Sequence, residues 1–200
     1  MTQQPRAKAG RPRSVGARAA ILDASIALTR EVGFDALAME AIAKRAGVGK
    51  STVYRWWPSK EVLIAEALGR FARAIPVPDT GSLEDDLTTI LLGTMRMYGD
   101  PATKVLLPAL LAAMARSPLV ARTVRSGLVS ARRTAMREVL ARAVTSGELP
   151  RTTDLELSLD LLSGPLLHRA VVMGRKINTH MVTAVVQAVL QGLGARKVKR

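Results

Sequence analysis

The sequence predicts an all-α fold in which a three-helix head containing a helix-turn-helix precedes a larger helical-bundle body. Hydrophobic residues make up 48% of the 200 residues, so a sizeable core can form. Aromatic residues make up only 3%, which leaves a core rich in Leu, Ala and Met, residues that lose little side-chain freedom in helices. Apolar residues recur at spacings of three and four, and strand-like alternation is hard to find.

The head is expected to contain one long helix, two short helices and the start of a fourth. Apolar residues share one face over residues 17–32, and Gly33 provides a C-terminal stop. Ser59 is a suitable N-cap for the strongly amphipathic fourth helix. The short helices between them are expected at residues 39–46 and 50–56.

The body is expected to contain five helices after a proline-rich linker at residues 75–81. Ser82 starts the first with a pattern that resembles a capping box, and Pro101 starts the second, because proline is tolerated at the first helical position. The other three are expected at residues 118–147, 154–173 and 179–193.

These features divide the chain into four segments. We expect a flexible basic arm at residues 1–14, the head with the start of its connecting helix at 15–75, the body at 76–195 and a basic tail at 196–200.

The positive charge is concentrated near the N-terminus. The net charge is +14, and residues 1–73 hold 13 Lys or Arg against 6 Asp or Glu. This imbalance indicates a polyanionic partner, with nucleic acid ahead of a membrane surface. Arg11 and Arg13 in the arm are candidates for insertion into a narrow minor groove, although a tail that makes only phosphate contacts fits equally well.

The residue inventory disfavours several classes of protein. There is no cysteine, and His168 and His180 are the only histidines, so we expect no disulfide, metal site or cofactor. The inventory also lacks a glycine-rich phosphate loop and paired catalytic groups, which argues against an enzyme. The N-terminus does not resemble a secretory signal, and no apolar run reaches the ~20 residues of a membrane span, so we expect a cytoplasmic protein with no membrane partner.

Residues 39–57 follow the pattern of a helix-turn-helix. Small Ala43 allows the second helix to cross the first closely, and Gly47 can adopt a positive φ at the turn. The apolar positions of both helices are expected to face inward. The second helix would then present an outward polar face that suits contacts with phosphates and base edges in the major groove. An ordinary helical hairpin with a polar face is the alternative interpretation.

This motif, followed by Tyr54, an aromatic pair and Ser59-Lys60-Glu61, resembles the TetR family of bacterial regulators. The specific match covers about residues 17–71, and the remainder is similar only in length and helix order. The resemblance implies an all-α homodimer that binds operator DNA, with a C-terminal body that binds a small-molecule effector. It also implies repression that the effector relieves.

The resemblance further implies which residues contact DNA. Arg55 is expected to read a base, because its guanidinium can bond guanine bidentately, and Tyr54 and Lys60 are expected to anchor phosphates. One departure concerns Ala38, where the family has Ser or Thr as a helix cap. The full set of expected contacts is Lys50, Ser51, Thr52, Tyr54, Arg55, Trp56 and Lys60, with Trp57 in a core position.

An effector pocket and a dimer interface are expected in the body. The last helix is apolar over most of its circumference, and residues 155–167 are similar, which indicates burial on more than one side. The pocket candidates, chosen as adaptable apolar or polar-tipped side chains, are Met95, Tyr98, Leu106, Leu110, Met114, Leu128 and His168. The dimer candidates are Leu159, Leu162, Leu166, Val186, Val189 and Leu190.

Two other functions remain open at this point. A non-specific architectural DNA-binding protein would also use the basic charge and the arm, and a membrane-surface protein would use the basic ends. A polar reading helix and a large body favour a sequence-specific regulator over both.

Overall fold

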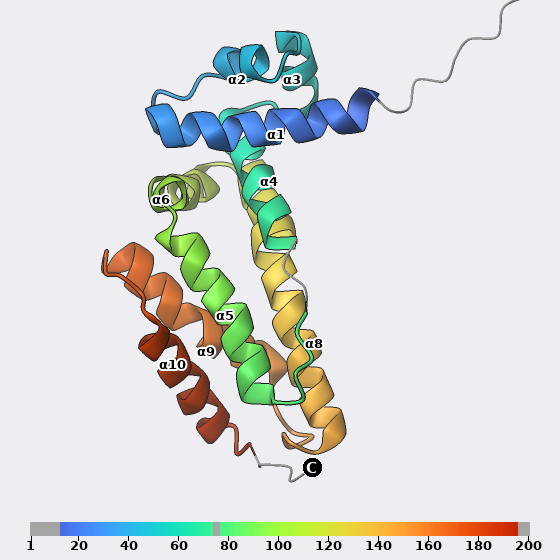
Figure 1. Cartoon of the computed structure of the whole chain (residues 1–200), viewed down its shortest axis with the longest axis vertical. Coiled ribbons are helices and arrows are strands. Elements are labelled where there is room, and N and C mark those ends of the chain that lie inside the picture. Colours follow the sequence, from blue (N-terminus) through green and yellow to red (C-terminus); the bar gives the residue numbers. More distant parts are fainter. Residues whose placement is uncertain (1–12, 74–76, 196–200) are drawn as a thin grey trace, which may run out of the picture.

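The computed structural model describes residues 13–73 and 77–195, and its regular elements in these ranges are all helical (Figure 1). The head comprises α1 (Arg13–Val32), α2 (Met39–Arg45) and α3 (Lys50–Trp56), followed by the connecting helix α4 (Lys60–Arg73). The body comprises α5 (Leu83–Gly99), α6 (Pro101–Arg116), α7 (Pro118–Val124), the π-helical turn η1 (Arg125–Val129), α8 (Ser130–Ser146), α9 (Leu155–Leu167), the π-helical turn η2 (His168–Val172) and α10 (Thr179–Gly192).

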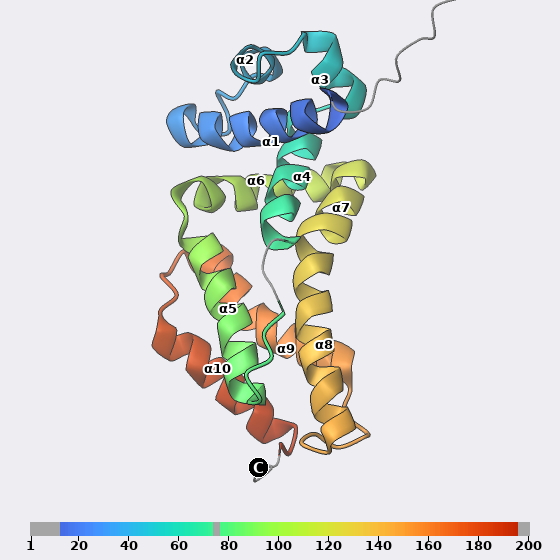
Figure 2. The same ribbon diagram turned by 45° about the vertical axis from the view of Figure 1, so that its right-hand side comes forward.

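The head lies at one end of an elongated molecule, and α4 runs from it into the body (Figures 1 and 2). Helices α6 and α7 lie beneath α1, and α4 packs against α7, η1 and α8. The helices α5, α8, α9 and α10 form the far end of the molecule as a bundle. The expected all-α architecture with a helix-turn-helix head is confirmed.

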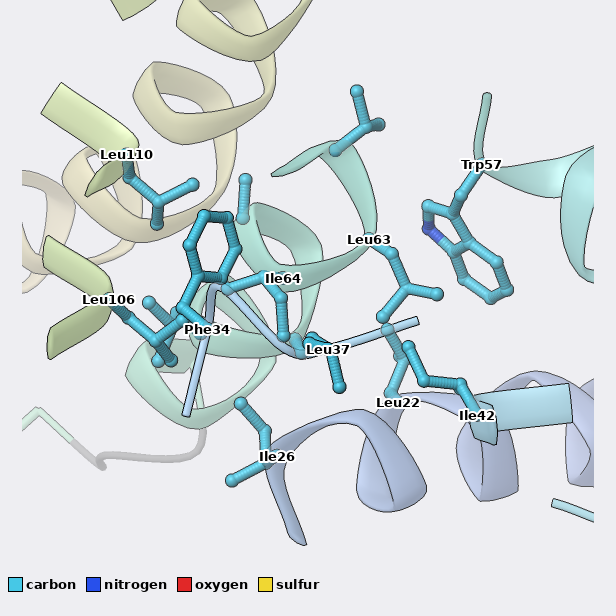
Figure 3. Close-up of a cluster of buried hydrophobic side chains, with 14 of the residues drawn as sticks. Leu22, Ile26, Phe34, Leu37, Ile42, Trp57, Leu63, Ile64, Leu106 and Leu110 are labelled. Carbon is cyan, nitrogen blue, oxygen red and sulfur yellow. The ribbon is translucent and has the colours of Figure 1, made fainter. Parts of the chain in front are cut away.

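Two hydrophobic cores hold the molecule together. The first joins head and body, because Leu106 and Leu110 of α6 are fully buried in the same cluster as Ile42, Trp57 and Leu63 (Figure 3). Because this core is continuous, apolar side chains hold α1 and α4 against the body. The head is therefore not attached by a flexible hinge alone. The second core fills the space between α5, α8, α9 and α10.

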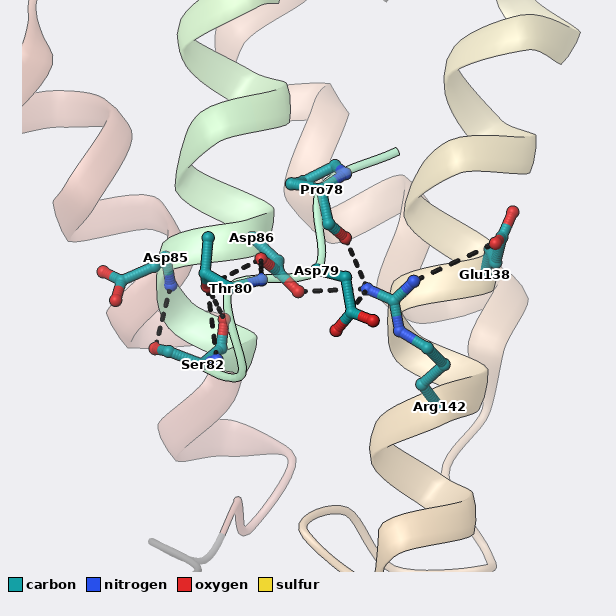
Figure 4. Close-up of polar contacts among 8 residues, drawn as sticks. All are labelled: Pro78, Asp79, Thr80, Ser82, Asp85, Asp86, Glu138 and Arg142. Carbon is teal, nitrogen blue, oxygen red and sulfur yellow. Dashed lines mark hydrogen bonds and ion pairs between the residues drawn. The ribbon is translucent and has the colours of Figure 1, made fainter. Parts of the chain in front are cut away.

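The segment that enters α5 is fixed by a buried carboxylate (Figure 4). Asp86 is 3% exposed, and its Oδ1 accepts hydrogen bonds from the backbone N–H and the hydroxyl of Thr80, at 2.9 and 2.8 Å. Its Oδ2 accepts from Nη2 of Arg142 at 3.0 Å, and the same guanidinium also donates to the carbonyl of Pro78. Both oxygens of the buried carboxylate therefore accept hydrogen bonds, and residues 78–86 are tied to α8.

Most helix ends are where the sequence signals place them. Gly33 and Gly147 adopt φ values of 79° and 80°, the left-handed conformation that ends a helix. The hydroxyl of Ser82 caps α5 by accepting from the N–H of Asp85, and Ser59 accepts from the N–H of Val62 at 3.4 Å. The first helix starts earlier than predicted, at Arg13, so this arginine belongs to α1 and not to the arm. Arg11 and the tail lie outside the described residues, as does the predicted boundary between residues 75 and 76.

The long helix predicted at residues 118–147 contains a π-helical turn that the sequence did not predict. Here α4 comes so close that a Cβ added to Gly69 would lie 2.9 Å from the Cα of Gly127. The two glycines allow the backbones to touch, and η1 provides the local widening at this contact.

Five of the six predicted dimer residues require correction. Leu159, Leu162, Leu166 and Val186 are 0% exposed, and Leu190 is 8% exposed, all within the second core of a single chain. Val189 is partly buried against the same core. These side chains stabilise the protomer, because the face of α9 and α10 that the periodicity identified as apolar is the one that packs inward.

Candidate nucleic-acid interface and body pockets

The turn between α2 and α3 is held by a glycine and by apolar packing. Gly47 has a φ of 67°, and the N–H of Val48 donates to the carbonyl of Ala43 at 3.0 Å. Ile42 and Val53 are fully buried, so they fix the crossing of the two helices. As a result, the opposite face of α3 points away from the core.

The outward face of α3 carries four exposed side chains, which are Lys50, Ser51, Tyr54 and Arg55. Thr52 and Trp56 are half-buried at its edges. Four of the α3 side chains expected on the outward face are therefore exposed, and their contact with DNA stays a prediction. Arg55 also lies with its guanidinium carbon 5.7 Å from the centre of the Trp56 ring, a cation–π contact that restricts where it points.

An acidic residue, Glu40 of α2, touches this face and was missed by the sequence analysis. Its Oε1 accepts a hydrogen bond from the hydroxyl of Tyr54 at 3.3 Å and lies 3.8 Å from Nζ of Lys50. Loss of hydration, and then the charge of Glu40, raise the pKa of Tyr54, so the phenol keeps its proton near neutral pH. Glu40 thus holds two prospective phosphate donors in position. Acidic residues are common at helix N-termini, so sequence alone gave no signal for this contact.

Trp57 has a structural role, as expected. It is 0% exposed, and its indole N–H donates to Oε2 of Glu66 at 2.9 Å. Arg18 of α1 pairs with the same carboxylate at 2.8 Å and lies 5.6 Å from the Trp57 ring centre. This cluster joins α1, α3 and α4, and it sets the position of α3 on the head.

Lys60 is bonded within the head itself. Its ammonium donates to the carbonyls of Phe34 and Asp35, at 2.8 and 3.1 Å, and lies 4.7 Å from the Phe34 ring centre. It therefore ties the loop after α1 to the start of α4, and one of its three N–H donors is left for a phosphate. The cap that Ala38 cannot supply is indeed missing, since no side chain caps α2 at this position.

The body contains a pocket of about 670 Å³ between α5, α6 and η2. Met95 and Tyr98, two of the pocket candidates, line it, and the binding of an effector there stays a prediction. The other pocket candidates need correction. Leu106, Leu110 and Leu128 are buried in the first core, Met114 packs against that core, and His168 is exposed outside the pockets found. The helical spacing that suggested pocket walls reflects core packing.

A second body pocket, of about 240 Å³, lies at the junction with the head. Ile26 and Arg30 of α1, Leu68 of α4, Met97 of α5 and Arg132 of α8 contribute to its walls. Next to it, Nη2 of Arg30 pairs with Oδ2 of Asp100, the N-cap of α6, at 3.0 Å. None of these charged residues was predicted from the sequence to line a pocket.

Both parts of the chain match known protein families. A family described as "Bacterial regulatory proteins, tetR family" matches residues 21–67, and one described as "Tetracyclin repressor-like, C-terminal domain" matches residues 77–189. The two matches together span most of the chain. The chain belongs to the TetR family.

Individual relatives agree with this assignment. The HTH-type transcriptional regulator YdeS of Bacillus subtilis is 34% identical over 94% of this chain and 95% of its own length. The DNA-binding transcriptional repressor TetR of Mycobacteroides abscessus is 30% identical over 78% of this chain and 83% of its own length. The crystal structure of the TetR family regulator SCO0332 matches with a TM-score of 0.76 and 28% identity, over 88% of this chain and 97% of that one.

As a TetR family member, the protein is a DNA-binding transcriptional regulator, and the motif of α2 and α3 is its DNA-binding element. The family binds operator DNA and acts as dimers with small-molecule effectors. Within residues 13–73 and 77–195, no helix combines the length and the apolar character that a membrane span needs.

Proposed function

We propose that this TetR family protein is a homodimeric repressor that binds a palindromic operator and leaves it when a small molecule occupies the body. The outward polar face of α3 carries this proposal, because its four exposed side chains stand on a rigid, buried crossing. A site on packed helices positions donors more accurately than a loop does.

Within this face, Arg55 reads a base, and the other donors bind the phosphate backbone of the DNA. Arg55 is exposed and is oriented by Trp56, which suits a bidentate bond to guanine. Ser51, Thr52, Tyr54 and Lys50 are the phosphate contacts, and Lys60 adds a weaker one because two of its N–H groups are already used. Arg11 and Arg13 contribute charge near the minor groove.

The second copy packs on the outer face of α9. Leu157 and Leu161 are 53% and 44% exposed there, one turn apart, and Gly164 continues the same face with open space around it. Large apolar side chains exposed in a row favour a partner surface. A twofold dimer that reads successive major grooves must hold its two α3 helices about 34–36 Å apart.

The effector acts through the first core, to which both head and body contribute. A ligand among α5, α6 and α8 bears on α6, and α6 packs against both α1 and α4. The ligand releases DNA to the extent that it binds the DNA-free arrangement more tightly.

DNA selection with the purified protein, followed by titration of the selected site, tests this function. We expect a palindromic site bound with a Kd of about 1–10 nM, and a loss of about 10- to 100-fold in Arg55→Ala. Arg151→Ala, which removes an exposed arginine from the turn before α9, is the matched control and is expected to bind normally. Equal affinity for all sequences, unchanged in Arg55→Ala, would instead identify a non-specific architectural protein.

A further inference from the structure

The junction pocket contains a half-buried arginine, Arg132, for which no anionic partner is found in the part of the chain that the structure describes. Nε of Arg132 is shielded from solvent and has no hydrogen-bond partner among the described residues. The remainder of the guanidinium donates only to the hydroxyl of Thr94 and, at 3.4 Å, to the sulfur of Met97. A thioether is a weak acceptor, so most of this donor group is poorly matched.

A poorly paired guanidinium in this position is energetically unfavourable unless a bound group pairs with it. Arginine stays charged in proteins, and removing part of a charged group from water without pairing it is unfavourable. Burial lowers the pKa of Arg132, and Tyr98 only partly offsets this effect. The same burial raises the pKa of Tyr98, so the phenol stays neutral and supplies no counter-charge near neutral pH.

The residues that line the pocket around Arg132 define which kind of ligand could pair with its charge. They combine apolar side chains, namely Ile26, Leu68 and Met97, with Arg30 and Arg96, and Asp100 is the single acidic residue among them. Asp100 is already engaged, because one oxygen pairs with Arg30 and the other caps α6. The cavity of about 240 Å³ thus has an excess of positive charge and a largely apolar lining.

We propose that the junction pocket binds the carboxylate group of a small aliphatic acid, with Arg132 as its principal partner. This inference rests on the proposed function, since it names the chemical class of the effector. A planar guanidinium binds a carboxylate through two parallel hydrogen bonds. A single guanidinium with apolar neighbours therefore suits a ligand that carries one negative charge. An inorganic phosphate has no apolar chain, so it cannot use the apolar walls of this pocket.

The location of the pocket also explains how the ligand is sensed. A bound carboxylate repels Asp100 and attracts Arg30, so it weakens the ion pair that joins α1 to the start of α6. Occupancy therefore acts directly on a contact between head and body.

The test uses butanoate, hexanoate and octanoate, the primary alcohols of equal chain length, and inorganic phosphate. Binding is measured by calorimetry and thermal shift on the full-length protein, and release is measured by fluorescence anisotropy on the selected operator. We expect the preferred carboxylate to bind about 10- to 100-fold more tightly than its alcohol, as one charge-assisted pair allows, and phosphate not to bind.

Arg132→Met should remove this preference while keeping or raising the Tm in the absence of ligand. Arg132→Lys, which keeps the charge but loses the fork, should bind carboxylate with intermediate affinity. Arg116→Met at the exposed end of α6 is the matched control and should behave as the wild type does.

The outcomes separate this inference from the proposed function. The inference is overturned if no carboxylate binds more tightly than its alcohol, if Arg132→Met retains the preference, or if it lowers the Tm by many degrees. Carboxylates that bind through Arg132 but leave the operator occupied would support the ligand site and contradict effector release. Alcohols that release the operator while carboxylates do not would contradict the ligand class and support effector release.

Discussion

At the scale of single residues, the protein is most constrained where two backbones meet. Gly69 of α4 and Gly127 of η1 approach so closely that a Cβ on Gly69 would lie 2.9 Å from the neighbouring Cα and 3.1 Å from the N of Leu128. Because backbone atoms cannot rotate away as side chains do, this contact leaves no room for alanine. Because α4 links head and body, this contact affects how the two parts are held together.

Gly69→Ala is expected to destabilise the protein by about 1–3 kcal/mol, the usual cost of overpacking. The opposite result is expected at Gly16 in α1, where nothing lies within 4 Å of an added Cβ. Gly16→Ala should stabilise the protein by about 0.5–1 kcal/mol, since alanine is the better helix former. Urea unfolding of both variants measures the difference, and equal stability would contradict the close contact.

At the scale of elements, α2 is a short helix without a side-chain cap at its N-terminus. It has only seven residues, and Ala38 at its N-cap leaves its first N–H groups without a side-chain acceptor. The missing cap was recognised in the sequence because N-capping depends on one local side chain. Its consequences reach the outward face, because Glu40 in the first turn of α2 positions Tyr54 and Lys50.

Ala38→Ser is expected to stabilise the protein by about 1 kcal/mol, equivalent to a rise in Tm of about 2–4 °C. Serine at this position can accept a hydrogen bond from the N–H two or three residues on. Ala36→Ser, an exposed change two residues earlier, serves as the control and should leave the Tm unaltered. A Tm that rises equally in both variants would show that capping is not the cause.

At the scale of the whole molecule, head and body share the first core. Leu106 of α6 lies in the same buried cluster as Ile42 and Trp57 of the head (Figure 3). Cooperative unfolding of both parts follows, because neither can expose its side of this core alone without losing the packing of the other.

Leu106→Ala is expected to cost about 2–5 kcal/mol, as for other fully buried leucines. The buried indole of Trp57 reports on the head and far-UV circular dichroism on all helices, so the two signals should shift together in this body variant. A head signal that keeps the wild-type midpoint while the helical signal shifts would show separate folding units.

The proposed dimer interface on α9 gives the second prediction at this scale. Replacing both Leu157 and Leu161 with Asp is expected to produce folded monomers, since it places charge on the exposed apolar face of α9. Light scattering after size exclusion measures the mass, and Leu119→Asp on α7 is the control for an exposed leucine elsewhere. Leu159→Ala should instead lower the Tm and leave the mass unchanged, because its side chain lies in the protomer core.

The sequence by itself determined the helical class, most helix ends, the missing cap at Ala38 and the polar face of α3. These features depend on local chemistry: helix propensity, glycine at a positive φ, capping hydroxyls and the periodicity of a short helix. The family resemblance added the expected DNA contacts to this local pattern.

Only the tertiary structure decided which apolar residues face a core, a pocket or a partner. Periodicity identifies one apolar face of α9 and α10 but does not say what covers it, so Leu159 and Val186 were assigned to a dimer interface and lie in the protomer core. The same ambiguity assigned Leu106 and Leu110 to a pocket. The charged groups at the junction, Arg132 above all, depend on contacts between residues far apart in the chain, which no local pattern encodes.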